Sequence, residues 1–154
     1  MIVQFKDLTE AEGELMYSLP IYISVLIAGA DGKIDSSEIK KAVSLAGLKK
    51  KTARKDLLEY YGHVNQDYED KIKVTIANLP GDQKEREKIL VEDIEKANDI
   101  FSKIDKVFAI KLYASLKETA VHIAEASGGV FGYMSVGYEE SRLVDLKMIK
   151  DPSK

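Results

Sequence analysis

Apolar residues recur along most of the chain at the spacing of one face of an α-helix, and nowhere does strand-like alternation replace this pattern. The breaks between the periodic segments fall where helix caps are expected. The pattern therefore predicts an all-α protein. The expected helices cover residues 9–29, 36–46, 52–61, 66–79, 82–101, 106–126 and 138–149.

Capping residues and helix breakers support these boundaries. Thr9 and Glu12 have the spacing of a capping box, in which each side chain binds an amide of the other residue. Pro20 lies inside the first helix and removes one amide donor, so we expect it to bend or divide that helix. Further helix ends are expected at Gly47, at Gly62 and at the pair Pro80-Gly81.

The segment 106–126 is the longest candidate helix, and Asp105 is placed to cap it. Its apolar residues surround the helix almost completely, whereas 82–101 has only a narrow apolar stripe. We therefore expect 106–126 to be the central and most buried helix.

Length and charge narrow the class of protein. The 154 residues suit one domain, 1–154, with its own core. The net charge is −3 without a strongly basic half, which disfavours nucleic-acid binding for the chain as a whole. The longest apolar run, 19–30, is too short to cross a bilayer. With no secretory signal pattern and no cysteine, we expect a cytoplasmic protein without membrane insertion, disulfides or thiolate chemistry.

Three carboxylates surround glycines in the stretch AGADGKIDSSE, residues 28–38. Gly29 suits a left-handed helix end, and Asp35 with Glu38 forms a second capping box, so the stretch reads as a corner between two helices. Asp31 takes no part in this capping. A divalent cation held by Asp31, Asp35 and Glu38 is therefore a second interpretation, although the spacing does not fit an EF-hand loop.

A second glycine-rich corner, AEASGG at 124–129, precedes the acidic pair Glu139-Glu140. Together with Ala30-Asp31-Gly32 and Glu38, it resembles the TerB-like family, compact helical domains named after tellurite-resistance proteins. The resemblance implies one compact bundle of about seven helices with an internal two-fold repeat of helix, corner and helix. It also implies that divalent metal binding would use the acidic corner residues, Glu139 and Glu140 among them.

The TerB-like resemblance also implies a functional class. Proteins of this family are associated with stress responses, metal handling and complexes at the membrane, and no enzymatic activity is established for them. The expectation is a non-enzymatic accessory or interaction protein with a protein partner, in a membrane-associated stress complex. A divalent cation is the one cofactor that the resemblance suggests.

Glu118, His122 and Glu125 share one face of the helix 106–126 and offer an alternative metal site. Such a site needs further ligands from facing helices, and His63 is the one other histidine. A partly buried histidine between glutamates that reach solvent is the favoured interpretation.

Residues 40–58 resemble the helix-turn-helix of the lactose-repressor family, with Leu45-Ala46-Gly47-Leu48 as the turn. A DNA-binding protein is thus the alternative function. Lysines between two helices, however, usually form a solvated corner. The residues that would contact DNA are Lys49, Lys50, Lys51, Thr52, Arg54 and Lys55.

Catalytic motifs are absent: the chain has no cysteine, no Gly-x-Ser-x-Gly elbow and no phosphate-binding glycine loop. The glycine-rich segment 128–137 instead carries large apolar side chains that either cover the core or bind a protein partner. The candidate partner-binding residues are Phe131, Tyr133 and Met134.

Overall fold

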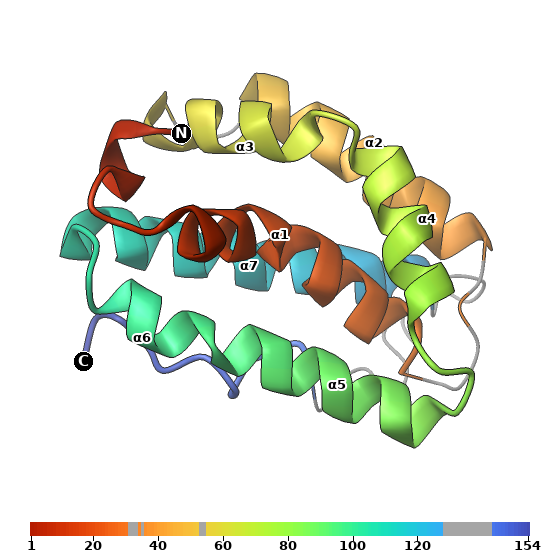
Figure 1. Cartoon of the computed structure of the whole chain (residues 1–154). Coiled ribbons are helices and arrows are strands. Elements are labelled where there is room, and N and C mark those ends of the chain that lie inside the picture. Colours follow the sequence, from red (N-terminus) through yellow and green to blue (C-terminus); the bar gives the residue numbers. More distant parts are fainter. Residues whose placement is uncertain (31–33, 35, 53–54, 128–142) are drawn as a thin grey trace.

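The computed structural model describes residues 1–30, 34, 36–52, 55–127 and 143–154, with the backbone alone at 36–38, 45, 50–52 and 126–127. Every regular element in these ranges is helical, which confirms the all-α class (Figure 1). None of these helices has the length and apolarity of a membrane span. The elements are η1 (Val3–Phe5), α1 (Glu10–Ala28), α2 (Ser36–Thr52), η2 (Lys55–Leu57), α3 (Leu58–Asn65), α4 (Tyr68–Asn78), α5 (Gln83–Glu95), α6 (Ala97–Phe101) and α7 (Lys106–Ser127).

Helix α1 lies at the centre of the molecule and contacts all six other α-helices (Figure 1). Eleven of its 19 residues are buried. In α7, by contrast, Val107 is 58% exposed and Ala114 also faces solvent. The expectation that 106–126 is the most buried helix is therefore wrong. The reason is charge: α7 carries three lysines and two glutamates along its length, whereas 19–30 contains no charged residue and can be surrounded completely.

Capping side chains begin three of the helices. Thr9 Oγ1 accepts from the Glu12 amide at 3.1 Å and Glu12 Oε1 accepts from the Thr9 amide at 2.9 Å, which confirms the predicted capping box. Asp105 Oδ2 accepts from the Phe108 amide at 2.9 Å and so caps α7, as expected. Asp82 caps α5 in the same way. These local signals were readable from the sequence because each capping bond joins residues three positions apart.

Pro20 does not divide α1, which is continuous from Glu10 to Ala28. Because proline has no amide hydrogen, the Met16 carbonyl lacks its partner within the helix. Tyr60 of α3 supplies the missing donor, with its hydroxyl 2.6 Å from the Met16 oxygen. Tyr60 is fully buried, so this bond forms inside the core and joins α3 to α1.

Replacing Tyr60 with phenylalanine is expected to lower the free energy of unfolding by about 1–2 kcal/mol, because the buried Met16 carbonyl then has no donor. Urea unfolding of both proteins measures this cost. In a Pro20→Ala background the new amide can reach Met16, so the cost of Tyr60→Phe should fall below about 0.5 kcal/mol. Equal costs in the two backgrounds would contradict the assignment.

Gly47 and Gly62 lie inside α2 and α3, so the helix ends predicted at these glycines are wrong. A glycine inside a helix costs only about 1 kcal/mol relative to alanine. The residues beyond the glycines offset that cost: Lys49 makes tertiary hydrogen bonds and Val64 is buried. The break between α3 and α4 falls instead at Asp67, which has a left-handed φ of 55°.

Residues 143–149 form successive turns, so the helix predicted over 138–149 is wrong in its described part. Leu146 has a φ of 48°, in the left-handed region that a right-handed helix excludes. Asn98 of α6 binds the backbone at the end of these turns, donating to the Met148 carbonyl at 2.9 Å and accepting from the Lys150 amide at 2.8 Å. The segment imitated a helix face because three buried residues recur at a spacing of three: Leu143, Leu146 and Ile149.

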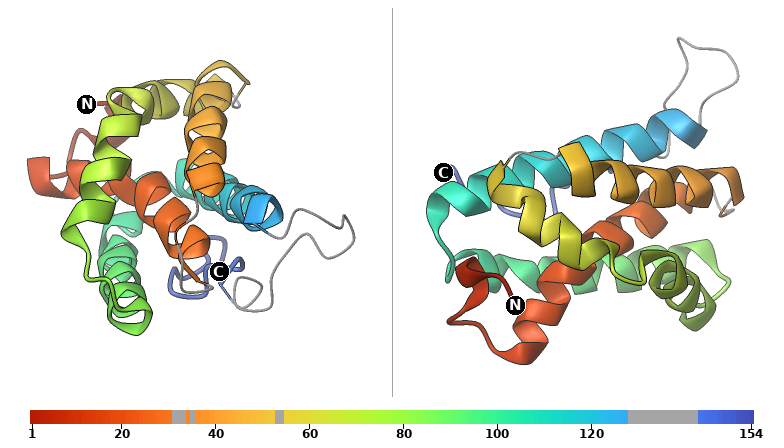
Figure 2. Two further views of the ribbon diagram at one scale, coloured as in Figure 1. Left: turned by 90° about the vertical axis from the view of Figure 1, so that its right-hand side faces the viewer. Right: turned by 90° about the horizontal axis from the view of Figure 1, so that it is seen from above.

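Helices α2 and α4 make few contacts with each other. Helix α2 lies beside α7, and α4 crosses over α1, as both views in Figure 2 show. Two buried side chains, Tyr68 and Ile72, hold α4 against the rest of the molecule. Because α2 packs mainly on α3 and α7 while α4 packs mainly on α1, their facing sides are incompletely covered.

Candidate functional site

Most residues of the predicted metal and partner sites lie outside the described part of the chain, and the predictions for them stay predictions. They are Asp31, Asp35, Glu139 and Glu140 of the metal site, Phe131, Tyr133 and Met134 of the partner site, and Arg54 of the DNA interface. The backbone alone is described for Glu38, Lys50, Lys51 and Thr52.

The described end of the first corner is bound by side chains of α5. Arg86 Nη2 donates to the Gly29 carbonyl at 3.0 Å, and Gln83 Nε2 donates to the Ala30 carbonyl at 3.3 Å. Arg86 is 7% exposed, so its positive charge lies against the negative end of the α1 dipole inside the protein. The C-terminal end of α1 is thus packed against α5, and the Gly29 and Ala30 carbonyl groups both have side-chain donors.

Gly29 has a φ of −93°, so the expectation that it supplies a left-handed backbone is wrong. Its role is steric. A Cβ at this position would lie 2.9 Å from Arg86 Nη2 and 3.2 Å from Ile34 Cγ1. Glycine at this position therefore gives the arginine room to approach the helix end closely.

The helix-turn-helix interpretation does not match the backbone. Helix α2 runs without interruption through 45–48, where the turn was predicted. Thr52 is the last residue of α2 and Lys55 begins η2, so the two do not share a recognition helix. The error follows from Gly47, because a glycine that ends a helix and one that a helix tolerates look the same in a sequence.

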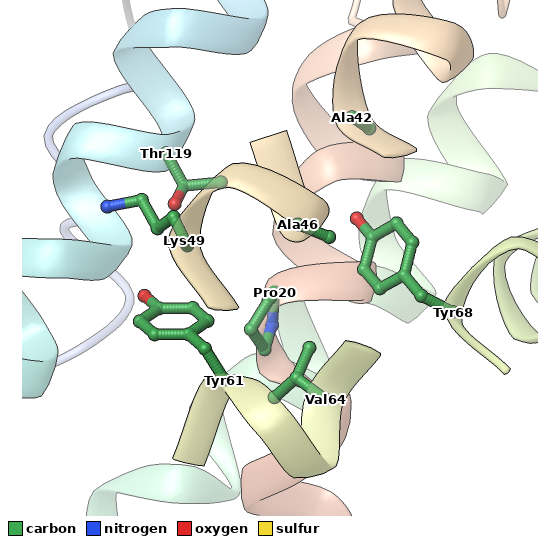
Figure 3. A pocket seen from close by; sticks show the side chains of 8 residues that line it. All are labelled: Pro20, Ala42, Ala46, Lys49, Tyr61, Val64, Tyr68 and Thr119. Carbon is green, nitrogen blue, oxygen red and sulfur yellow. The ribbon is translucent and has the colours of Figure 1, made fainter. Parts of the chain in front are cut away.

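Lys49 belongs to a polar cluster between α2, α3 and α7, part of which is shown in Figure 3. Its side chain is 12% exposed, and its Nζ donates to Ser115 Oγ at 3.1 Å and to Glu118 Oε1 at 3.0 Å. The same Nζ lies 5.5 Å from the centre of the Tyr61 ring. Tyr61 Oη shares a hydrogen bond with Ser115 Oγ. Lys49 is therefore directed into the protein, away from the DNA interface predicted for it.

A lysine, a tyrosine and a serine in contact are a set that can move protons. This cluster, however, has no space for a substrate, and the pKa of its tyrosine does not suit a general base. The cavity beside Lys49 and Tyr61 has a volume of about 10 Å³, room for about one water molecule. Burial raises the pKa of Tyr61 to about 12, although hydrogen bonds with Ser115 and Thr119 act in the opposite direction. A general base needs a pKa near the working pH. The cluster joins three helices instead.

The alternative metal face on α7 is not assembled by the described residues. Glu118 pairs with Lys49 at 3.0 Å, and Glu125 is exposed. His122 is half-buried, and its buried Nδ1 makes no hydrogen bond within the described structure. In the described ranges, no group of three or more histidine, aspartate or glutamate side chains could hold a metal ion.

Within the described part of the chain, a groove between α2 and α4 has a size that suits a partner. Its volume is about 710 Å³, within the range of roughly 300–1,000 Å³ typical of ligand sites. Its apolar residues are half-buried and pack against the core, so its floor continues the hydrophobic core. The lining comprises the apolar Ile34, Ile39, Val43 and Ile76 and the polar Lys40, Ser44, Glu69 and Lys73.

Sequence reasoning missed this groove, although α2 carries a signal for it. Ala42 and Ala46 form one apolar stripe, which is buried against the neighbouring helices. Ile39 and Val43 form a second stripe, displaced around the helix and only partly buried beside α4. A helix with two apolar stripes needs two partners, and the described structure supplies a full partner for one of them.

Comparisons with known proteins do not test the family resemblance of this chain. The resemblance of its two corners to the TerB-like family therefore stays a prediction. No protein-family model, no curated protein and no solved structure matches this chain.

Proposed function

We propose that this protein is a non-enzymatic interaction module that binds an amphipathic helix of a protein partner in the groove between α2 and α4. The observation that carries the proposal is the partly buried apolar floor of the groove, framed by two helices. Helix-in-groove recognition uses such a surface, because the apolar face of the bound helix replaces the missing packing.

The spacing of the lining residues fits a helix as the ligand. Ile39 and Val43 are one turn apart on α2, and Glu69, Lys73 and Ile76 follow one side of α4 over two turns. The α4 wall is about 10 Å long at 1.5 Å per residue, so a partner helix would bury about two turns. An interface of that size is small, and we expect micromolar rather than nanomolar affinity.

Two further points support the non-enzymatic class. The polar cluster around Lys49 and Tyr61 has space for a water molecule but not for a substrate. The TerB-like resemblance implies an accessory protein in a stress-response complex, which agrees with a binding groove. The proposal thus extends to such a complex as the setting in which the partner helix is found.

Selection from a displayed peptide library tests this function. The library fixes leucines at i, i+3, i+4 and i+7 of 16-residue peptides and randomises the flanking positions, and the full chain is the bait. Val43→Asp is expected to weaken binding of the enriched peptides at least about tenfold, because it places a charge in the apolar floor. Binding is measured by fluorescence anisotropy.

Ser44→Trp provides a second test that leaves the core intact, because Ser44 is exposed and lines the groove. The indole should fill the groove and block the peptide. The matched controls are Val74→Asp on α4, outside this groove, and Ala114→Trp on the exposed side of α7. A library that enriches no binder, or binders that tolerate both groove substitutions, would contradict the proposed function.

A further inference from the structure

The two helices that wall the groove are basic in a protein that is otherwise acidic. Helices α2 and α4 together contain seven lysines against three acidic residues, a formal balance of +4. The rest of the chain has 16 basic and 23 acidic side chains, a balance of −7, which gives the net charge of −3. Of these seven lysines, Lys40 and Lys73 line the groove, whereas Lys49 is directed away from it. Glu69 is the one acidic side chain in the described lining, so the groove walls carry a small excess of positive charge.

We propose that the occupant of the groove is an acidic amphipathic helix and that Lys40 selects its acidic residues. This inference rests on the proposed function and names the chemistry of the partner. Complementary charges at the rim of an apolar site set specificity and speed association, while the apolar floor supplies most of the affinity.

Lys40 is the rim charge best placed for this role. On the α4 wall, Lys73 Nζ lies 3.3 Å from Glu69 Oε1, so these opposite charges neutralise each other within one helix. Lys40 is exposed on the α2 wall, and none of the described side chains forms an ion pair with it. An acidic residue beside the apolar stripe of a bound helix would pair with Lys40.

The described surface favours a helix over nucleic acid. Phosphate binding needs positive charge but no apolar floor, and here Ile39, Val43 and Ile76 lie directly beside the lysines. Lys49, the first of the lysines predicted to contact DNA, is directed inward to Ser115 and Glu118. The combination of apolar floor and basic rim corresponds to the two faces of an acidic amphipathic helix.

Three synthetic peptides with the same leucine stripe and with glutamate, glutamine or lysine at the flanking positions test the inference. For the full chain we expect the glutamate peptide to bind at least about fivefold more tightly than the glutamine peptide, as for one or two rim ion pairs. The lysine peptide should bind most weakly. The preference should shrink as salt is raised, because rim charges are screened.

Lys40→Glu should abolish or invert the preference for the glutamate peptide, while the glutamine peptide binds as before. The matched control is Lys106→Glu, a charge reversal at an exposed position at the start of α7, which should leave the preference unchanged. If the glutamine peptide binds and Val43→Asp weakens it, but the three peptides bind equally, the inference fails while the proposed function stands. Two other results would overturn the inference. One is displacement of the glutamate peptide by a short DNA duplex; the other is concentration-dependent dimerisation in sedimentation that Lys40→Glu removes.

Discussion

Raising the pH from 9 to 11 is expected to lower the free energy of unfolding by about 4 kcal/mol, because three buried tyrosines resist ionisation in the folded protein. Burial raises the pKa of Tyr61 and of Tyr68 to about 12 and raises that of Tyr60 well above its usual value. In the unfolded chain all three titrate near pH 10. Each raised pKa therefore favours the fold below pH 10, and this contribution is lost as the pH rises toward 12.

The size of the effect follows from proton linkage. Between pH 10 and 12, each tyrosine that is ionised when unfolded and neutral when folded costs about 1.4 kcal/mol of stability per pH unit. Three such residues approach the whole stability of many domains, about 5–15 kcal/mol. We therefore expect cooperative alkaline unfolding in which tyrosinate absorbance near 295 nm and loss of helical circular dichroism coincide.

Urea unfolding at pH 8, 9, 10 and 11 measures this dependence. Tyr68→Phe removes one of the three groups and should reduce the loss between pH 9 and 11 by about a third, whatever it does to stability at pH 8 through its bond to Ser24. A loss below about 1 kcal/mol in the original chain, or tyrosines that ionise near pH 10 while the helices persist, would contradict the expectation.

Replacing Arg86 with methionine is expected to lower the free energy of unfolding by about 1.5–3 kcal/mol, the range of a hydrogen bond from a charged donor. Methionine retains most of the buried volume but has no donor for the Gly29 carbonyl. It also removes the positive charge from the C-terminal end of α1. Because α1 contacts all the other α-helices, loosening its end should lower the thermal midpoint of the whole fold.

Chemical unfolding of Arg86→Met and Arg86→Lys separates geometry from charge. Arg86→Lys keeps the charge but loses the planar fork, so an intermediate cost is expected. Lys84→Met, on the same helix but exposed, should change stability by less than about 0.5 kcal/mol. An Arg86→Met protein as stable as the original would show that the bond to Gly29 contributes nothing net, as happens for some buried charges.

Features that depend on neighbouring residues were predictable. The Thr9–Glu12 capping box, the Asp105 cap and the helical spacing of the apolar residues all appear in the structure. Each is set by residues within one helical turn, so the chain order contains all the information required.

Features that depend on packing between distant residues were not predictable from the sequence. Gly47 resembled a helix end, and Leu143, Leu146 and Ile149 resembled a helix face. In both cases the local preference is worth about 1 kcal/mol or less, and contacts with other helices outweigh it. Asn98 binds the backbone on either side of Ile149, at sequence separations of 50 and 52 residues. No local sequence pattern predicts such a contact.

The sequence by itself determined the helical class, the capped helix starts and the absence of cysteine chemistry, because these follow from local spacing and composition. The tertiary structure alone decided that α1 is the central helix, that Arg86 donates a hydrogen bond to its C-terminal end, and that Lys49 is directed inward. It also decided that the second apolar stripe of α2 borders a groove. The physical reason is that burial and charge neutralisation depend on which helices meet, and that is settled by packing of the whole chain.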